Sequence, residues 1–187
     1  FHVEQGEILG IVGESGSGKS MTALTIMDLQ KNTASVKTGE IMIEGNNVLA
    51  MKENQRLAYL GSQMGMVFQE PMTSLNPVLK IGAQVDEMLT LHTDLSKKEK
   101  RERTIQALLD VGLKNPEEVY EQYPHELSGG MRQRVMIAMA MMNKPKLLIA
   151  DEPTTALDVS VQTQILELLK KMNKEYGVSI ILISHDL

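Results

Sequence analysis

The sequence contains no cysteine and no tryptophan, and it has only 4 tyrosines and 2 phenylalanines among 187 residues. The lack of cysteine excludes a disulfide framework and a thiolate metal site. No apolar run approaches the ~20 residues of a membrane-spanning helix, and no signal peptide opens the chain. The net charge of −5 disfavours broad nucleic-acid binding, which needs a basic face. Since 42% of the residues are apolar, the chain can still bury a core.

The two ends of the chain are unusual. It starts at Phe1 rather than at methionine, and it stops at Leu187 directly after an apolar run. The length alone favours one small domain. We nevertheless expect truncation at both ends, with the chain forming the middle of a larger domain.

Short apolar runs alternate with amphipathic stretches along the chain. The predicted strands cover residues 8–12, 41–43, 64–68, 147–150 and 178–183. The last two runs, 147–150 and 178–183, show little alternation, so both faces of these strands should be covered. Strands of this kind, separated by helices, predict an α/β fold with a mainly parallel sheet.

The middle of the chain has helical periodicity and no strong strand signal. Ser96 and Glu99 match a capping box, and the helix that they start should stop at Gly112. Helices are predicted over residues 18–29, 81–92, 96–112, 128–143 and 158–174, with a weaker signal over 54–61. We therefore expect a helical subdomain over 70–145, inserted between two core segments, 1–69 and 146–187.

A glycine-rich segment follows the first predicted strand. It matches G-x-x-x-x-G-K-[ST] and reads Gly13-Glu14-Ser15-Gly16-Ser17-Gly18-Lys19-Ser20. Its glycines permit backbone angles that turn N–H groups onto a phosphate, and the next helix adds its positive end. Lys19 should reach the β- and γ-phosphates of a nucleotide, and the Ser20 hydroxyl should ligate Mg²⁺. The alternative is a structural turn with a solvated lysine.

Two carboxylates follow the buried run 147–150. Asp151 and Glu152 should stand at the carboxyl end of a parallel strand, where ligands bind in such sheets. Asp151 fits a partner of Mg²⁺, held directly or through water. Glu152 could orient and deprotonate an attacking water. The alternative is an ordinary loop start at Pro153.

The segment Leu127-Ser128-Gly129-Gly130 precedes another predicted helix. Two glycines in a first helical turn are poor helix formers. They make sense if a ligand approaches the backbone closely, at an anion site formed by bare N–H groups. A serine N-cap beside a flexible linker remains the alternative.

Taken in order, these motifs resemble the nucleotide-binding subunit of ABC transporters. The resemblance also includes Gln69 after a strand, the triplet Ala156-Leu157-Asp158 and His185. Two stretches, 67–77 and 129–135, are similar to the oligopeptide/dipeptide importer branch, whose relatives also handle nickel. Met131 stands where the family commonly has glutamine, which we interpret as a trait of that branch.

The resemblance implies a P-loop NTPase (RecA-like) core and two subunits that sandwich two ATP molecules head to tail. Ser128, Gly129 and Gly130 would then contact the γ-phosphate of the partner's ATP. Gln69 would approach Mg²⁺ and the attacking water. His185 would donate to the γ-phosphate and hold Glu152 in place.

The resemblance has two further implications, one for the dimer contact and one for adenine stacking. Asp158 would lie at the dimer contact as well as cap its helix. The family's adenine-stacking aromatic would precede Phe1, so no residue of this chain is assigned to it.

The resemblance implies an ATP-hydrolysing subunit that powers peptide import. Its partners would be a second nucleotide-binding subunit, transmembrane permease subunits and, indirectly, a solute-binding protein, with no nucleic acid. Its place would be peripheral, on the cytoplasmic face of the membrane.

The alternative is a soluble ABC ATPase that acts on ribosomes or DNA. The stretch 67–77 argues against the ribosomal alternative. Only about 105 residues separate Gly18 from Pro124, without the sustained heptads of a chromosome-type coiled coil. A P-loop kinase would not need the Ser-Gly-Gly helix.

Overall fold

Four parallel strands form the central sheet of the computed structural model, which describes residues 1–30, 36–70, 74–90, 93–155 and 157–185. The strands are β1 (Ile8–Val12), β4 (Met64–Val67), β5 (Leu147–Asp151) and β6 (Ser179–Ser184). They lie in the order β1-β6-β5-β4, and all three pairings are parallel. Two short strands, β2 (Met42–Ile43) and β3 (Asn46–Asn47), form a separate antiparallel pair. The predicted α/β fold with a mainly parallel sheet is confirmed.

Both faces of the central sheet are covered, because alternate side chains of each strand enter different cores. On β5, Leu148 and Ala150 belong to one buried cluster, whereas Ile149 belongs to the other. On β6, Ile180 faces the first cluster and Ile181 the second. A strand with two buried faces has no polar positions to alternate with, which explains the continuous apolar runs.

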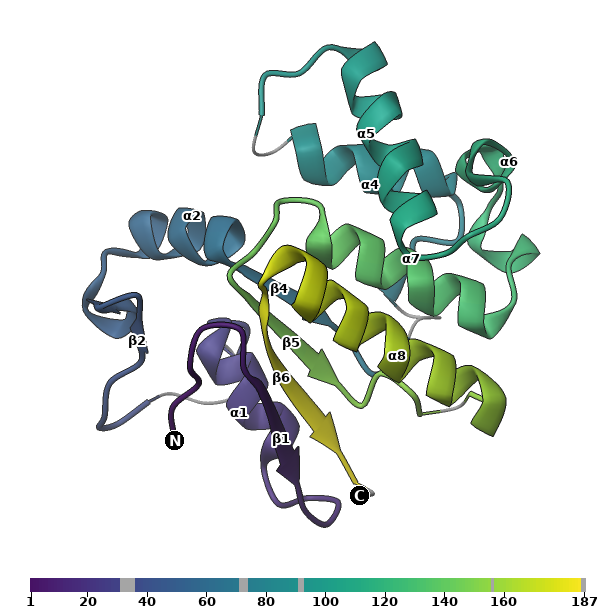
Figure 1. The fold of residues 1–187 in the computed structure, drawn as a ribbon. Coiled ribbons are helices and arrows are strands. Elements are labelled where there is room, and N and C mark those ends of the chain that lie inside the picture. The colour runs from purple at the N-terminus through teal and green to yellow at the C-terminus, as the bar shows by residue number, and fades with distance from the viewer. Residues whose placement is uncertain (31–35, 71–73, 91–92, 156, 186–187) are drawn as a thin grey trace.

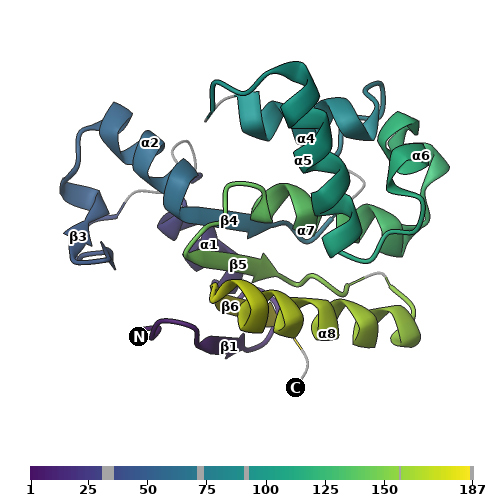
Figure 2. The ribbon, with the colours of Figure 1, turned by 45° about the horizontal axis from the view of Figure 1, so that its top comes forward.

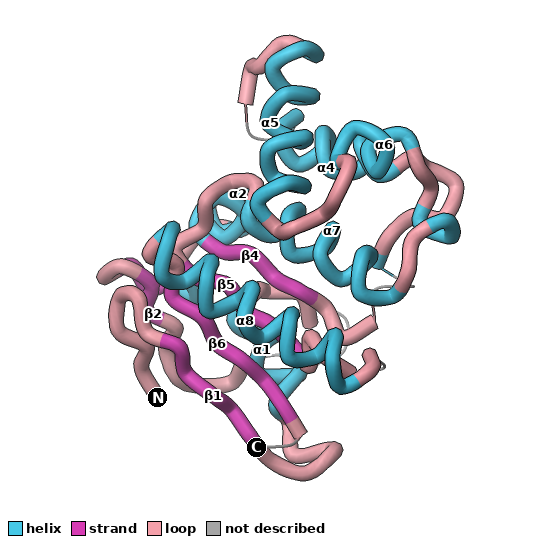
Figure 3. The backbone as a smooth tube through the Cα atoms, turned by 45° about the vertical axis from the view of Figure 1, so that its right-hand side comes forward, coloured by secondary structure: helices cyan, strands magenta, loops and turns pink. Residues whose placement is uncertain are grey.

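Helices supply the cover on both faces of the sheet. They are α1 (Lys19–Ile26), α2 (Glu53–Gln63), α4 (Ile81–Thr90), α5 (Lys97–Asp110), α6 (Pro116–Glu121), α7 (Gly129–Met141) and α8 (Val159–Tyr176), with 3₁₀ turns at Val48–Ala50 and Pro124–Glu126. Residues of α7 and α8 pack in the first cluster, and residues of α1 and α2 in the second. Figure 3 shows the four strands side by side with α8 crossing them. Helices α4, α5 and α6 gather beyond α7, away from the sheet (Figure 2).

The chain between residues 70 and 145 contains helices and no strand within its described part. The capping box is confirmed: Ser96 accepts from the N–H of Glu99, whose carboxylate accepts from the N–H of Ser96. Gly112 follows the end of α5 with φ of +78°. Helix α6 was not predicted from the sequence, and His92 lies outside the described residues.

Two other features of the helices bear on the sequence predictions. Asp158 stands at the N-cap position of α8, but its side chain makes no capping hydrogen bond, so that part of the prediction was wrong. Among the described helices, none combines the length and the apolarity needed to cross a bilayer.

Helix α7 packs very closely on the edge strand β4. A Cβ atom built on Gly65 of β4 would overlap the carbonyl oxygen of Ala140 in α7. A backbone carbonyl within a helix cannot swing away as a flexible side chain can. Glycine at this position therefore lets the helix lie directly against the strand.

We predict that Gly65→Ala destabilises the protein by about 1–3 kcal/mol, because the added methyl forces α7 away from β4. Gly10→Ala is the matched control, since a Cβ at Gly10 of β1 meets nothing within 4 Å. Thermal or denaturant unfolding of the full-length variants measures both effects. Equal stability of the two variants would contradict the close contact.

Candidate functional site

The parallel sheet brings four segments to one edge. Strands β1, β5 and β6 point the same way, and the register pairs Val12 with Ser184 and Asp151 with Ile183. The glycine-rich loop leaves the carboxyl end of β1, and His185 follows the carboxyl end of β6. Gln69 follows β4 at the same edge. Ligands of open α/β sheets bind at this edge.

The glycine-rich loop wraps around the side chain of Lys19. Its ammonium donates to the carbonyl oxygens of Gly13, at 2.6 Å, and Glu14, at 2.9 Å, and the residue is only 9% exposed. Gly16 and Gly18 have φ of +80° and +93°, in the left-handed region that glycine enters without strain. Two glycines of the loop therefore adopt backbone angles that other residues rarely reach, and the loop encloses a buried positive charge.

The loop leads directly into α1, whose first turn contains no acidic residue. The side chain of Ser20 in this turn donates to Oδ1 of Asp151 at 3.0 Å. Burial raises the pKa of Asp151 above its ordinary value, and the nearby charge of Glu152 raises this pKa further. The hydrogen bond from Ser20 and the charge of Lys19 act in the opposite direction, but the pKa stays raised. A buried carboxylate beside a hydroxyl and a helix N-terminus is thus held at the end of β5.

Three side chains from different segments converge on one carboxylate oxygen of Glu152. Gln69 Nε2 donates to Oε2 at 2.9 Å, Thr155 Oγ1 donates to it at 3.0 Å, and His185 Nδ1 lies 3.3 Å away. The side chain of Glu152 is 14% exposed, and that of His185 is 50% exposed. Glu152 also has φ of +46°, which is unusual for a residue with a side chain. Such strain persists only where the surroundings hold it.

This arrangement leaves the other oxygen of Glu152 available. Within the described part of the chain, no hydrogen bond is made to Oε1. A carboxylate fixed through one oxygen can present the second to a water molecule and accept its proton. Gln69, Glu152 and His185 were predicted as site residues from the sequence, but Thr155 was not. The only sequence signal for Thr155 is a hydroxyl three residues after the glutamate.

The serine-glycine-glycine segment lies elsewhere in the molecule. Figures 1 and 2 place the first turn of α7 toward α6, away from the loop between β1 and α1. Ser128 is the N-cap of α7 and accepts from the N–H of Met131 at 3.3 Å. The chain thus does not bring this helix end to its own glycine-rich loop.

The glycines of this turn also have a reason within the chain. A Cβ on Gly130 would lie 2.7 Å from Cγ1 of Val161 on α8, and one on Gly129 would lie 3.3 Å from Leu157. A larger residue at position 130 would therefore force Val161 or one of the two helices to shift, whether or not a ligand approaches. Asp158 lies nearby and is exposed, whereas Ala156 falls outside the described residues.

A strand, a phosphate loop, a helix and a carboxylate at the end of another parallel strand of the same sheet define a P-loop nucleotide-binding α/β protein. A family model described as ABC transporter matches residues 1–155. The chain belongs to this ABC transporter family.

Known proteins support the same family over the whole chain. The chain is 52% identical to the oligopeptide transport ATP-binding protein AppD of Bacillus subtilis (strain 168), covering 100% of this chain and 57% of that protein. It is 50% identical to the dipeptide transport ATP-binding protein DppD of Haemophilus influenzae (strain ATCC 51907 / DSM 11121 / KW20 / Rd), with the same coverage. The chain therefore spans little more than half the length of these relatives.

A solved structure is also similar to this chain. It is the dimeric post-hydrolysis state of the ATP-binding cassette MJ0796 bound to ADP and Pi, with a TM-score of 0.85 and 32% identity. The match covers 100% of this chain and 78% of that one.

We predict that Gly130→Ala destabilises the ligand-free protein, because overpacking costs about 1–3 kcal/mol and outweighs the gain of up to about 1 kcal/mol from better helix propensity. In a Val161→Ala background the clash is absent, so Gly130→Ala should there raise the free energy of unfolding relative to Val161→Ala alone. Denaturant unfolding of the single and double variants checks both expectations. If glycine served only a ligand, Gly130→Ala alone would stabilise the ligand-free protein.

Proposed function

We propose that this chain is the ATP-binding and ATP-hydrolysing part of a subunit that powers peptide import through a membrane ABC transporter. The observation that carries the proposal is the Glu152 carboxylate, held by three side chains beside the pair formed by Ser20 and Asp151. Relatives named for oligopeptide and dipeptide transport support peptides as the cargo class.

In this proposal the glycine-rich loop binds the phosphates of ATP. Lys19 exchanges the loop carbonyls of Gly13 and Glu14 for phosphate oxygens, which are stronger acceptors because they are charged. The N–H groups of the loop and the first turn of α1 supply further donors. The similar MJ0796 cassette is described as bound to ADP and Pi, which supports nucleotide binding by this chain.

The residues beside the loop also fit Mg²⁺. The Ser20 hydroxyl and the Asp151 carboxylate, with the amide oxygen of Gln69, are the hard oxygen ligands that this ion prefers. The described residues contain no cluster of three or more acidic or imidazole side chains suited to a metal. Mg²⁺ sites on nucleotides need few protein ligands, since phosphates and water complete them. When bound, the ion supplies positive charge against the phosphates.

Glu152 acts as the general base in this proposal. Its Oε1 accepts a proton from the attacking water, while Gln69 and Thr155 keep the carboxylate aligned through Oε2. His185 holds the same oxygen, and it can donate to the γ-phosphate from its exposed side. Positioning and charge stabilisation are the main contributions in phosphoryl transfer.

The Ser128, Gly129 and Gly130 turn contacts the γ-phosphate bound to a partner subunit, with Asp158 at the same contact. Two observations support this: the turn lies away from the chain's own phosphate loop, and the similar MJ0796 cassette is described as a dimer. The remaining partners are transmembrane permease subunits and, through them, a solute-binding protein. The subunit then works on the cytoplasmic face of the membrane.

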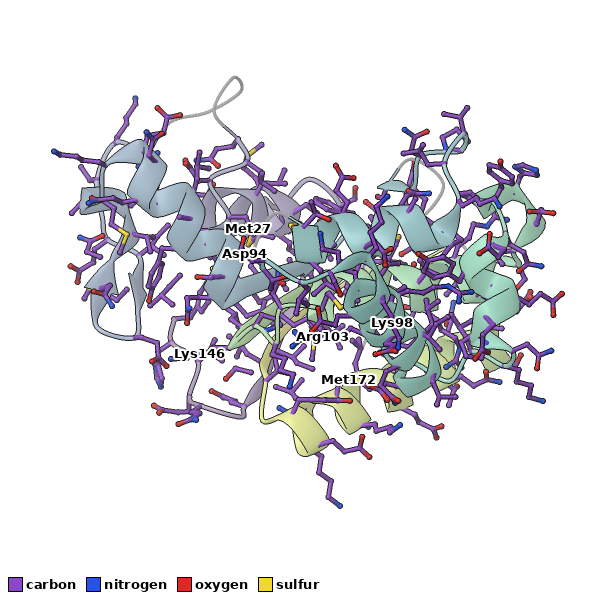
Figure 4. The ribbon with its side chains drawn as sticks, turned by 90° about the horizontal axis from the view of Figure 1, so that it is seen from above. Met27, Asp94, Lys98, Arg103, Lys146 and Met172 are labelled. Atoms are coloured by element: carbon purple, nitrogen blue, oxygen red, sulfur yellow. The ribbon has the colours of Figure 1, made fainter. Side chains whose placement is uncertain are left out.

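Lys19→Ala should weaken ATP binding about 10- to 100-fold, because hydrogen bonds to charged groups contribute roughly 1.5–3 kcal/mol. Calorimetric titration of the full-length subunit measures this affinity. Lys98→Gln is the matched control, since this exposed lysine stands on α5 (Figure 4). Undiminished affinity in Lys19→Ala would refute the assignment of the phosphate loop.

Glu152→Gln should leave ATP binding intact and slow hydrolysis by about 10²–10⁴-fold, because the amide cannot accept the proton of water. Steady-state phosphate release and ATP titration measure the two quantities separately. Glu87→Gln, an exposed substitution on α4, is the control. Normal turnover of Glu152→Gln in the full transporter would exclude the general-base role.

The transport role is tested by purification of the full-length subunit with its bound partners. Permease subunits and a solute-binding protein that retains short peptides are the expected companions. Recovery on ribosomes or DNA instead would contradict peptide import.

A further inference from the structure

One side chain in the middle of α7 connects three helices. Arg134 lies six residues after the N-cap Ser128. Its Nη1 donates to the carbonyl oxygen of Val111 at 2.6 Å, at the end of α5, and its Nη2 donates to Oε1 of Gln164 at 3.1 Å, on α8. The guanidinium therefore links α7 both to the outer helices and to the helix that covers the sheet.

The guanidinium of Arg134 fits closely against the C-terminal end of α5. A Cβ on Gly112, which has φ of +78°, would lie 3.0 Å from Nη1 of Arg134. The Val111 carbonyl belongs to the last turn of a helix, where carbonyls lack helical partners and favour a positive charge. A planar fork can serve two acceptors in fixed directions, which a lysine ammonium does not.

Apolar contacts also join the first turn of α7 to α8 and the residues before it. Gly130 packs against Val161 and Gly129 against Leu157. Apolar contacts of this kind limit how closely the helices approach, but they set the rotation and tilt of α7 less sharply than hydrogen bonds with defined angles.

A small tilt of α7 would matter for a phosphate contact. Six residues of helix span about 9 Å, so a tilt of roughly 10° about Arg134 moves the helix end by about 1.6 Å. A misplacement of about 1 Å can reduce a rate about 10²-fold.

We propose that Arg134 is a positioning residue that sets the direction of the α7 N-terminus toward the partner's γ-phosphate. It acts through Val111 and Gln164 and touches no nucleotide itself. This inference rests on the proposed function, since it assumes that the Ser128 turn completes the partner's ATP site.

The first test compares Arg134→Met and Arg134→Lys in the full-length subunit. Both variants should keep ATP affinity within about 2-fold, because the phosphate loop is separate, and both should lose at least about 10-fold in kcat. Arg103→Met is the matched control: this arginine is exposed on α5 (Figure 4) and should leave kcat unchanged.

A merely structural role would give a different pattern. It would lower the unfolding midpoint and reduce ATP-binding capacity and activity together, with kcat per binding-competent molecule unchanged. Titration of binding sites therefore accompanies each rate measurement. An unchanged kcat per site in Arg134→Met would overturn the inference.

The second test mixes two impaired variants, Arg134→Met and Lys19→Ala. In a head-to-tail pair, one of the two sites then has an intact phosphate loop and an intact α7. Random pairing of equal amounts should return about a quarter of the wild-type activity if the sites act independently. The reference mixture is Ser128→Ala with Lys19→Ala, which tests the shared site itself.

The two mixtures separate the two proposals. Recovery in both supports the role of Arg134 across the subunit contact. Recovery in the reference mixture alone would overturn this inference and leave the proposed function standing. Failure of both mixtures would reject the shared site, and the role of Arg134 with it.

Discussion

The parallel pairing of β5 between β4 and β6 is the constraint on which the candidate site depends. Because the three strands run in the same direction, the residues that follow them meet at one edge, and Gln69, Glu152 and His185 come within hydrogen-bond reach. Reversing one strand of five residues would move its end by about 16 Å. The convergence on Glu152 is therefore a consequence of strand direction, supported locally by Thr155.

The same sheet brings buried charges of opposite sign close together. Lys19 and Asp151 are each less than a tenth exposed, and both belong to segments that leave the carboxyl edge. Carbonyl oxygens of the glycine-rich loop accept hydrogen bonds from Lys19, and the Ser20 hydroxyl donates one to Asp151. A buried charge needs such partners. In the proposed function these are the groups that engage the nucleotide, and within the chain each of them has a hydrogen-bond partner.

Glycine at the start of α7 has two explanations that a sequence cannot separate. In the proposed function a ligand approaches this turn, and independently of any ligand a Cβ at position 130 would overlap the Val161 side chain. A second tight contact, between Gly65 and Ala140, holds the other end of α7 against β4. Together with Arg134, these contacts give α7 a defined place between the sheet and the outer helices.

The strand runs, the phosphate loop, the capping box and the acidic pair could be read from the sequence, because each depends on neighbours within a few residues or on periodic burial. Helix α6 was missed, since its six residues show too little periodicity, and the Asp158 side chain does not cap α8 although its position is right. Thr155 and Arg134 could not be recognised, because their partners are set by how segments pack. Local chemistry and burial patterns are thus determined by the sequence itself. The tertiary structure decided which oxygen of Glu152 is held and where α7 points, because those depend on distant backbone segments brought together by the sheet.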